Sequence, residues 1–176
     1  ALMTTKTQFQ ETSTSNRNRP RPIRVLLVDD EHGFREMSAE HLESVGMEIE
    51  QAGNGSGALA ILKARAFDVA VFDLKMPDMD GLELLARVKP ETPEMEILML
   101  TARGDVETAV EAMRRGAHHY LLKPVKMAEL QAALERAGEK AALNRMRDGH
   151  TAVQDHQSRT RHREFLAFGP KSKSVL

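Results

Sequence analysis

The sequence contains no cysteine and no tryptophan, and its 176 residues include only one tyrosine. The absence of cysteine excludes disulfides, thiolate metal sites and cysteine nucleophiles, and it is compatible with a reducing compartment. At 4% aromatic residues, the chain has few side chains on which nucleic-acid bases stack. Its apolar runs are far shorter than a membrane span, and the first residues lack the apolar core of a signal peptide. We therefore expect a cytoplasmic protein.

The formal net charge of −1 conceals an uneven distribution of charge along the chain. Residues 1–22 carry a net charge of +3 and residues 144–176 one of +4, which leaves −8 on residues 23–143. The first segment is nearly devoid of apolar residues and cannot offset the entropy of ordering, so a disordered basic tail is predicted. Nucleic-acid binding is the alternative for the basic ends, but their sparse charges favour solvated tails.

Between these ends, apolar runs and amphipathic segments alternate five times. Residues 23–28, 69–72 and 97–100 are continuously apolar, which predicts strands buried on both faces. Residues 47–50 alternate apolar and charged side chains, as expected of a strand at a sheet edge, and residues 120–122 form the last predicted strand. The fold class is therefore α/β, a doubly wound five-stranded parallel sheet with the flavodoxin-like strand order 2-1-3-4-5.

The helices between the strands are recognised by their apolar spacing. In residues 32–45, the predicted apolar face consists of Phe34, Met37, Leu42 and Val45. In the helix predicted to be capped by Asp105, it consists of Val106, Ala109, Val110 and Met113. Residues 58–65 and 82–88 are shorter helices. The last helix begins at Met127 and is expected to pack on the sheet, and its C-terminal extension past Ala137 is a candidate dimer contact.

Asp73 follows a predicted central strand directly and precedes a turn rich in proline, aspartate and glycine. Open α/β sheets bind ligands at the carboxyl ends of their strands, which would place Asp73 in a functional site. Aspartate is also a common helix cap, so this stretch alone supports a structural role equally well.

Four of the predicted strands end in chemically distinct residues, namely Asp29 and Asp30, Asp73, Thr101, and Lys123. Three carboxylates at one crevice repel one another unless a cation is present, and hard oxygen ligands suit Mg²⁺. Lys123 would neutralise charge on a phosphoryl group, the Thr101 hydroxyl would donate to it, and Ala102 leaves space beside it. Asp73 is then the natural nucleophile, with an aspartyl phosphate as product.

Four fragments of the chain resemble, in order, the receiver domain of bacterial two-component response regulators. They are residues 28–31 (VDDE), 73–81 (DLKMPDMDG), 100–102 (LTA) and 120–124 (YLLKP). The resemblance covers about residues 23–143, the predicted receiver domain, and leaves residues 144–176 as a helix extension and basic tail. It implies that Asp73 accepts a phosphoryl group from the phosphohistidine of a sensor histidine kinase.

The resemblance also implies a metal site and a switch. Mg²⁺ would be bound by Asp30, Asp73 and the main-chain carbonyl of Lys75, with Asp29 acting through water. Phosphorylation would draw Thr101 inward and turn Tyr120 into the vacated space, and the bond before Pro124 is expected to be cis. The surface built from the fourth helix, the fifth strand and the fifth helix would then repack and bind partners or a second subunit.

Two other functions fit parts of the pattern. A Mg²⁺-dependent phosphohydrolase usually has a second acid two residues after its nucleophile, where this chain has Lys75. A scaffold that never takes up phosphate would be expected to lack one of the acids, the threonine or the lysine. We therefore expect a phosphoacceptor that promotes its own phosphotransfer and dephosphorylation, not an enzyme. Because no output motif follows residue 148, the chain is either a stand-alone receiver or a fragment of a larger transcription regulator.

Overall fold

The computed structural model describes residues 20–102 and 106–167, with side chains as far as residue 149. Strands and helices alternate along the described chain. The strands are β1 (Arg24–Val28), β2 (Glu48–Ala52), β3 (Val69–Asp73), β4 (Glu96–Thr101) and β5 (His119–Leu122). The helices are α1 (His32–Ser44), α2 (Gly55–Ala64), α3 (Gly81–Val88), α4 (Val106–Arg114) and α5 (Met127–Ala167).

The five strands form one parallel sheet in the order β2-β1-β3-β4-β5. This order confirms the fold class and the topology predicted from the sequence. The half-polar strand β2 lies at one edge of the sheet, as its alternating side chains indicated, and β5 lies at the other. The chain reverses its direction of travel across the sheet between β1 and β3, the point at which open α/β sheets form a crevice.

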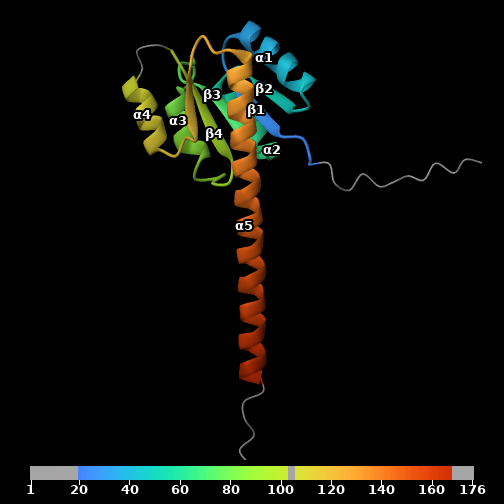
Figure 1. Cartoon of the computed structure of the whole chain (residues 1–176). Coiled ribbons are helices and arrows are strands. Elements are labelled where there is room, and N and C mark those ends of the chain that lie inside the picture. The colour runs from blue at the N-terminus through green and yellow to red at the C-terminus, as the bar shows by residue number, and fades with distance from the viewer. Residues whose placement is uncertain (1–19, 103–105, 168–176) are drawn as a thin grey trace, which may run out of the picture.

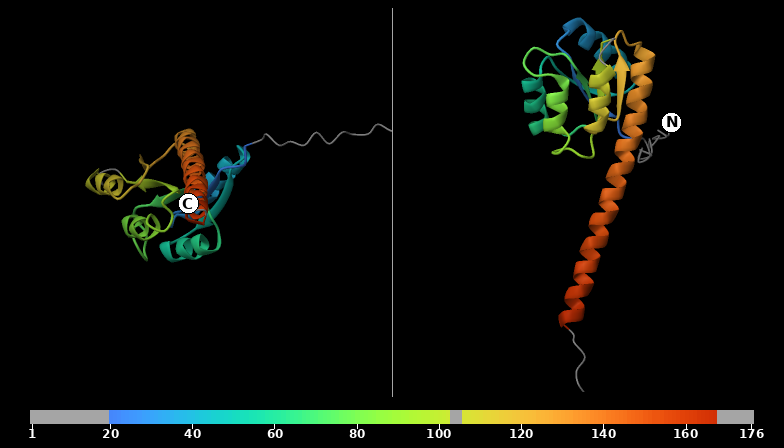
Figure 2. Two further views of the ribbon diagram at one scale, coloured as in Figure 1. Left: turned by 90° about the horizontal axis from the view of Figure 1, so that it is seen from below. Right: turned by 90° about the vertical axis from the view of Figure 1, so that its left-hand side faces the viewer.

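The side chains of the central strands alternate between two apolar layers. In β1, Leu26 and Val28 pack in the layer of α2, α3 and α4, whereas Val25 and Leu27 pack in the layer of α1 and α5. β3 and β4 divide their side chains in the same way. Figure 2 shows helices on both sides of the sheet. Because both faces are covered, the interior positions of these strands are apolar and the sequence shows no alternation there.

The apolar faces predicted for two helices are confirmed only in part. Leu42 is buried and Phe34 packs against the core, and Ala109 is buried in α4. In α1, Met37 is 55% exposed and Val45, at the C-cap, is 46% exposed, while the buried residues are Ser38, Ala39 and Leu42.

In α4, only the small residues Ala109 and Ala112 are buried, so this helix contacts the sheet over a narrow strip. Its Val106, Val110 and Met113 are exposed. Apolar spacing identifies residues that share a helix face, but not which face the sheet covers. The predicted cap Asp105 lies outside the described residues.

Helix ends agree with the glycine positions in the sequence. Gly46 and Gly116 have φ values of +93° and +96°, and each follows the end of a helix. This left-handed conformation is readily adopted by glycine, so α1 and α4 stop where the sequence predicted. α2 begins earlier than predicted, at Gly55, because Asn54 accepts a hydrogen bond from the Gly57 amide at 2.7 Å and caps the helix.

Helix α5 continues far beyond the sheet (Figure 1). Its first turns bury Leu130, Leu134, Ala137 and Ala141 against the sheet and α1. At 1.5 Å per residue, its 41 residues span about 60 Å. Among the described residues, neither α5 nor any other helix is both long and apolar enough to cross a membrane.

Candidate functional site

The strand register brings the predicted site residues to one edge of the sheet. Val28 at the end of β1 is paired with Phe72 of β3, and Asp73 is paired with Leu100 of β4. Asp29 therefore follows β1 next to Asp73, and Thr101 ends the neighbouring strand. Lys123 follows β5 directly, and its amide donates to the Thr101 carbonyl at 2.8 Å.

Three carboxylates meet at this edge. Asp29, Asp30 and Asp73 each offer an oxygen, and these oxygens lie within 4.8 Å of one another. Asp29 is fully buried and Asp73 nearly so, whereas Asp30 is exposed. Mg²⁺–oxygen distances are about 2.1 Å, so two ligands across one ion are about 4 Å apart. The three oxygens thus fit a divalent cation that remains open to solvent on the Asp30 side.

Lys123 supplies the positive charge of the cluster. Its Nζ lies 2.6 Å from Oδ2 of Asp29 and 3.6 Å from Oδ1 of Asp73. The ammonium also lies over the ring of Phe34, 4.9 Å from the ring centroid. Burial lowers the pKa of Lys123, but the hydrogen bond and charge of Asp29, together with Asp73, outweigh it and raise the pKa above its usual value. Lys123 therefore stays protonated.

Asp73 is held in an environment that disfavours its charge. Burial raises the pKa of Asp73 to about 6, and the charges of Asp29 and Asp30, together with a side-chain hydrogen bond that protonated Asp73 donates to Asp30, add to the effect. Lys123 opposes this shift but does not cancel it. Like charges in a partly desolvated crevice are the usual cause of such a rise. Above pH 6 the site therefore holds excess negative charge that a cation would relieve.

Thr101 and Tyr120 occupy different environments. Thr101 is buried at the end of β4, and its hydroxyl donates to the Ala102 carbonyl over a long distance of 3.3 Å. Ala102 is exposed beside it. Tyr120 is 36% exposed, with its ring centroid 5.8 Å from that of His119. In this structure the tyrosine is thus turned outward.

The loop between β3 and α3 is fixed at two points. Asp78 accepts hydrogen bonds from the amides of Gly55 and Ser56 at the start of α2, at 3.1 and 2.9 Å. At the other end of the loop, a Cβ on Gly81 would lie 2.5 Å from the Asp73 carbonyl oxygen, so only glycine fits there. The peptide bond between Lys123 and Pro124, across the site, is cis. The sequence did not indicate the role of Asp78, because its partners are more than 20 residues away.

Two buried acids at the amino ends of the strands, away from the acid cluster, were also not predicted from the sequence. Asp68 is bonded by Arg21 and Arg145, and Glu96 by His118, Lys140 and Asn144. Their positions next to strand starts looked like ordinary loop acids. Lys140, Asn144 and Arg145 thereby bind α5 to the sheet where the helix begins to extend beyond it. None of the predicted site residues takes part in these contacts.

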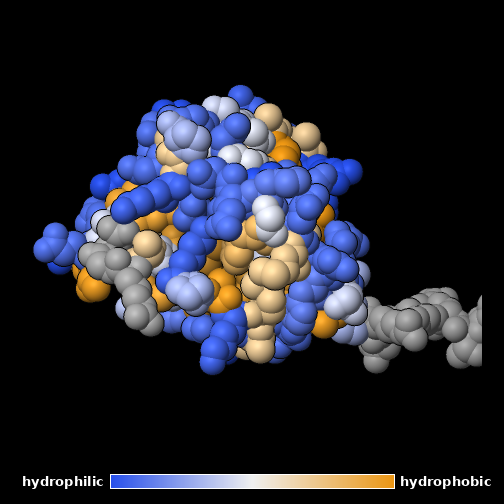
Figure 3. Space-filling view, turned by 90° about the horizontal axis from the view of Figure 1, so that it is seen from above, coloured by the Kyte–Doolittle hydropathy of each residue, from blue (hydrophilic) through white to orange (hydrophobic). Residues whose placement is uncertain are grey.

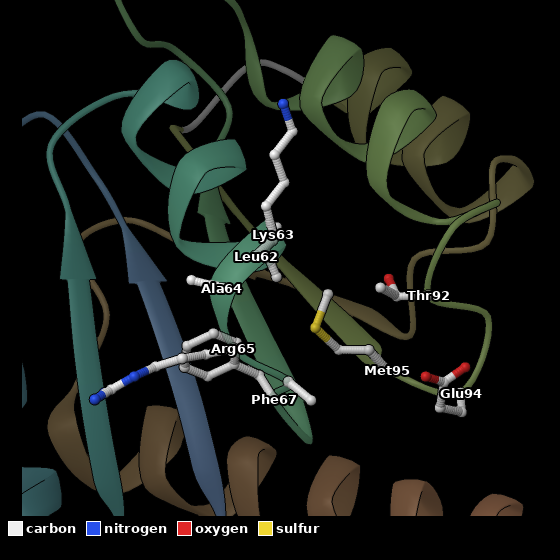
Figure 4. Close-up of a pocket in the computed structure, with 9 residues that line it drawn as sticks. Leu62, Lys63, Ala64, Arg65, Phe67, Thr92, Glu94 and Met95 are labelled. Carbon is white, nitrogen blue, oxygen red and sulfur yellow. The ribbon is translucent and has the colours of Figure 1, made fainter.

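A hollow of about 290 Å³ lies between the segment after α2 and the segment after α3 (Figure 4). Leu62, Phe67 and Met95 contribute apolar surface to it, and Thr92 and Glu94 lie on the side formed by the segment after α3. It lies at the end of β3 away from Asp73, and it brings together no set of groups comparable to the acid cluster.

Exposed apolar side chains gather on α4 and β5. They belong to Val106, Val110, Met113, Tyr120 and Leu122, each at least 36% exposed. Figure 3, seen from above, shows apolar atoms on the side of the molecule where α4 lies, within a mostly hydrophilic surface. We call these five residues the α4–β5 apolar patch.

Comparison with known proteins identifies the family. The family model of the response regulator receiver domain matches residues 25–135. The probable transcriptional regulatory protein TcrX of Mycobacterium tuberculosis is 38% identical over 122 residues, which cover 67% of this chain and 52% of TcrX. Regulatory protein AtoC of Escherichia coli is 38% identical over 114 residues, 65% of this chain and 25% of AtoC.

A solved structure gives the same result. The receiver domain of NtrX from Brucella abortus superposes with a TM-score of 0.62 at 38% identity, covering 65% of this chain and 98% of that one. This chain thus spans about half the length of TcrX and a quarter of that of AtoC. Fold, acid cluster and family match agree, and the chain belongs to the response regulator receiver domains.

Proposed function

We propose that the protein is a phosphorylation switch in which Asp73 accepts a phosphoryl group from the phosphohistidine of a sensor histidine kinase. In this transfer the phosphorus–nitrogen bond breaks while a carboxylate oxygen of Asp73 bonds to phosphorus, and the histidine leaves with the electron pair. The observation that carries the proposal is the cluster of Asp29, Asp30 and Asp73 with the Lys123 ammonium between two of them.

The residues around Asp73 have the charges that the transfer needs. With a pKa of about 6, Asp73 is ionised at pH 7.5 and is available as a nucleophile. Lys123, 3.6 Å from its carboxylate, neutralises charge on the bound phosphoryl group. Thr101 and Ala102 complete the phosphoryl site, the first by its hydroxyl and the second by leaving space. Such transfer depends mainly on positioning and charge stabilisation.

We propose Mg²⁺ as the cation, held by Asp29, Asp30, Asp73 and the main-chain carbonyl of Lys75. When bound, the ion neutralises negative charge on the phosphoryl oxygens. Asp30 and Asp73 would hold the ion directly and Asp29 would hold it through water, in keeping with the burial of Asp29 under Lys123. After transfer, the same acids position water for the loss of the phosphoryl group, which makes the protein promote its own dephosphorylation.

We further propose that phosphorylation is transmitted to the face made of α4, β5 and α5. The Thr101 hydroxyl turns from the Ala102 carbonyl toward the phosphoryl group, and Tyr120 moves inward from its exposed position. Inward rotation of Tyr120 changes the α4–β5 apolar patch, which then binds an output partner or a second copy of the chain. An exposed apolar patch of this kind is typical of an interaction surface.

Domain organisation and setting are part of the same proposal. We propose a receiver unit at residues 23–143, preceded by a basic tail at 1–22 and followed at 144–176 by a helix extension and basic tail. TcrX and AtoC are longer than the segments matched here, and by analogy with them we propose that the receiver acts as part of a larger regulator. By family membership, we expect it to work in the cytoplasm.

The test is intact-mass measurement after incubation with acetyl phosphate and Mg²⁺. The expected product carries one added phosphoryl group, and EDTA or Asp73→Ala abolishes it. Asp80→Asn is the matched control, since Asp80 lies in the same loop but caps α3 through the Glu83 amide at 2.7 Å. A phosphoryl group that is still added to Asp73→Ala, or none added to the unaltered protein, contradicts the assignment of Asp73.

A further inference from the structure

Arg35 lies in the first turn of α1, and its guanidinium reaches back over the loop between β1 and α1. Its Nη1 donates to the main-chain carbonyl of Asp29 at 2.6 Å, and its Nη2 lies 3.3 Å from Nδ1 of His32. The loop that it covers carries Asp29 and Asp30, two of the three acids of the cluster. Arg35 is thus bonded to the backbone of the loop, not to the acidic side chains.

The same guanidinium lies against a second loop, the one between β2 and α2. A methyl group on Gly53 would lie 3.4 Å from Nη1 and 3.6 Å from Cζ of Arg35. The two loops also meet through the Asp29 amide, which donates to the Ala52 carbonyl at 3.2 Å. Arg35 therefore fixes the first loop from the side opposite Lys123, which bonds the Asp29 side chain at 2.6 Å.

Helix stability does not explain this placement. A cation in the first turn of a helix faces the positive end of the helix dipole. α1 has no acidic residue in its first turn, and the side chain of its N-cap residue, Glu31, makes no capping hydrogen bond. In addition, the Arg35 Nε is buried and has no hydrogen-bond partner among the described residues. A buried donor without a partner destabilises the folded protein, so the position of Arg35 is explained by its contacts with the loop and not by helix stability.

We propose that Arg35 is a positioning residue for the metal-binding acids. Its bond to the Asp29 carbonyl holds the backbone of residues 29 and 30, and thereby both carboxylates, in the geometry that a divalent cation requires. Groups that orient metal ligands commonly change metal affinity by about 10–100-fold when they are removed. The inference rests on the proposed function, because it assigns the cation to this cluster.

The test compares Mg²⁺ affinity in the full chain by isothermal titration calorimetry. Arg35→Met keeps the aliphatic stem near Gly53 and removes the guanidinium, and we expect it to weaken Mg²⁺ binding about 10-fold. Arg35→Lys keeps a donor within reach of the carbonyl and should recover most of the affinity. Arg87→Ala is the control, because this arginine pairs with Glu83 on the exposed surface of α3. Circular dichroism verifies that each variant folds, and Arg35→Ala replaces the methionine variant if it does not fold.

Phosphoryl uptake from acetyl phosphate then separates positioning from a general loss of structure. The Mg²⁺ concentration for half-maximal rate should rise about 10-fold in Arg35→Met, while the rate at saturating Mg²⁺ stays near that of the unaltered protein. Mg²⁺ affinity within twofold of the unaltered protein would overturn the inference. Tighter binding would also overturn it, since Arg35 would then act as a competing cation. If the unaltered protein takes up no phosphoryl group, it is the proposed function that fails.

Discussion

The Lys123 ammonium is hydrogen-bonded to the Asp29 carboxylate at 2.6 Å, across 94 residues of sequence. Asp29 has no exposed surface, so this pair compensates a fully buried negative charge. It ties the end of β5 to the end of β1, on opposite sides of β3 and β4. The same two residues thus support both the fold and the acid cluster.

Replacing Lys123 by methionine should destabilise the protein, because Asp29 is left buried without its cation. Breaking a fully buried ion pair costs about 3–5 kcal/mol. Since the Lys123 side chain is 22% exposed, we expect a smaller loss, about 2–3 kcal/mol in the free energy of unfolding. Urea denaturation in EDTA measures it. Lys126→Met, at an exposed lysine nearby, should change stability by less than about 0.5 kcal/mol. Equal effects of the two substitutions would show that the Asp29–Lys123 pair is unimportant for stability.

Asp73→Asn should stabilise the metal-free protein at pH 7.5. The folded protein holds the Asp73 proton more tightly than the unfolded chain, with a pKa of about 6 against an ordinary 3.8. Stability contributed by this group therefore falls as pH rises through this window, and the loss is complete above pH 6. At about 1.4 kcal/mol per unit of pKa, removing the charge should gain about 2–3 kcal/mol.

Urea denaturation in EDTA tests this gain at pH 7.5 and at pH 4. At pH 4 the difference from the unaltered protein should nearly vanish, because Asp73 is then protonated in the folded state. Asp80→Asn serves as the control for loss of one loop carboxylate. An asparagine variant that is no more stable at pH 7.5 would show that Asp73 is not under electrostatic strain.

Asp78→Ala should destabilise the loop after β3 and the start of α2 together. Hydrogen bonds from the Ser56 and Gly55 amides lower the pKa of Asp78 to about 2. The stability from this carboxylate is present above pH 3.8 and is lost as pH falls toward 2. At pH 7 the melting temperature should drop by about 4 °C, a typical effect of losing a helix cap. Glu94→Ala, at an exposed loop acid, is the control, and a difference that persists unchanged at pH 2 would contradict the role of the carboxylate.

The sequence predicted the strand order and the meeting of Asp29, Asp30 and Asp73 at one edge, because both follow from the apolar patterns of the strands. Buried parallel strands are continuously apolar, and Asp29, Asp73 and Thr101 follow or end such runs directly. Contacts between distant segments leave no comparable pattern. Arg145, for example, bonds Asp68 from 77 residues away, and nothing in either neighbourhood indicates it. The apolar face of α4 was predicted correctly only at Ala109, because small alanines, and not its larger apolar residues, face the sheet.

Ser38→Ala should stabilise the protein by about 0.5–1 kcal/mol. Ser38 is fully buried in α1, and its hydroxyl has no hydrogen-bond partner among the described residues. Alanine removes the unpaired polar group and is the better helix former. Urea denaturation measures the gain, with Ser44→Ala as the control, because the Ser44 hydroxyl donates to the His41 carbonyl at 2.6 Å. A loss of stability in Ser38→Ala would indicate that the hydroxyl is hydrogen-bonded in solution.

Arg145→Ala should loosen α5 where it leaves the sheet. Arg145 pairs with Asp68, which is buried and is otherwise held by the partly exposed Arg21 and the Arg24 amide. Removing the Arg145 guanidinium leaves the buried Asp68 carboxylate with less positive charge beside it. The helix after Ala141 also loses one of its contacts with the sheet. Amide hydrogen exchange in residues 142–149 should accelerate about 10-fold, while exchange in β1 and β3 stays slow. Met146→Ala, at a side chain that is 67% exposed, should leave exchange unchanged. Equal acceleration in both variants would show that Asp68 does not anchor the helix.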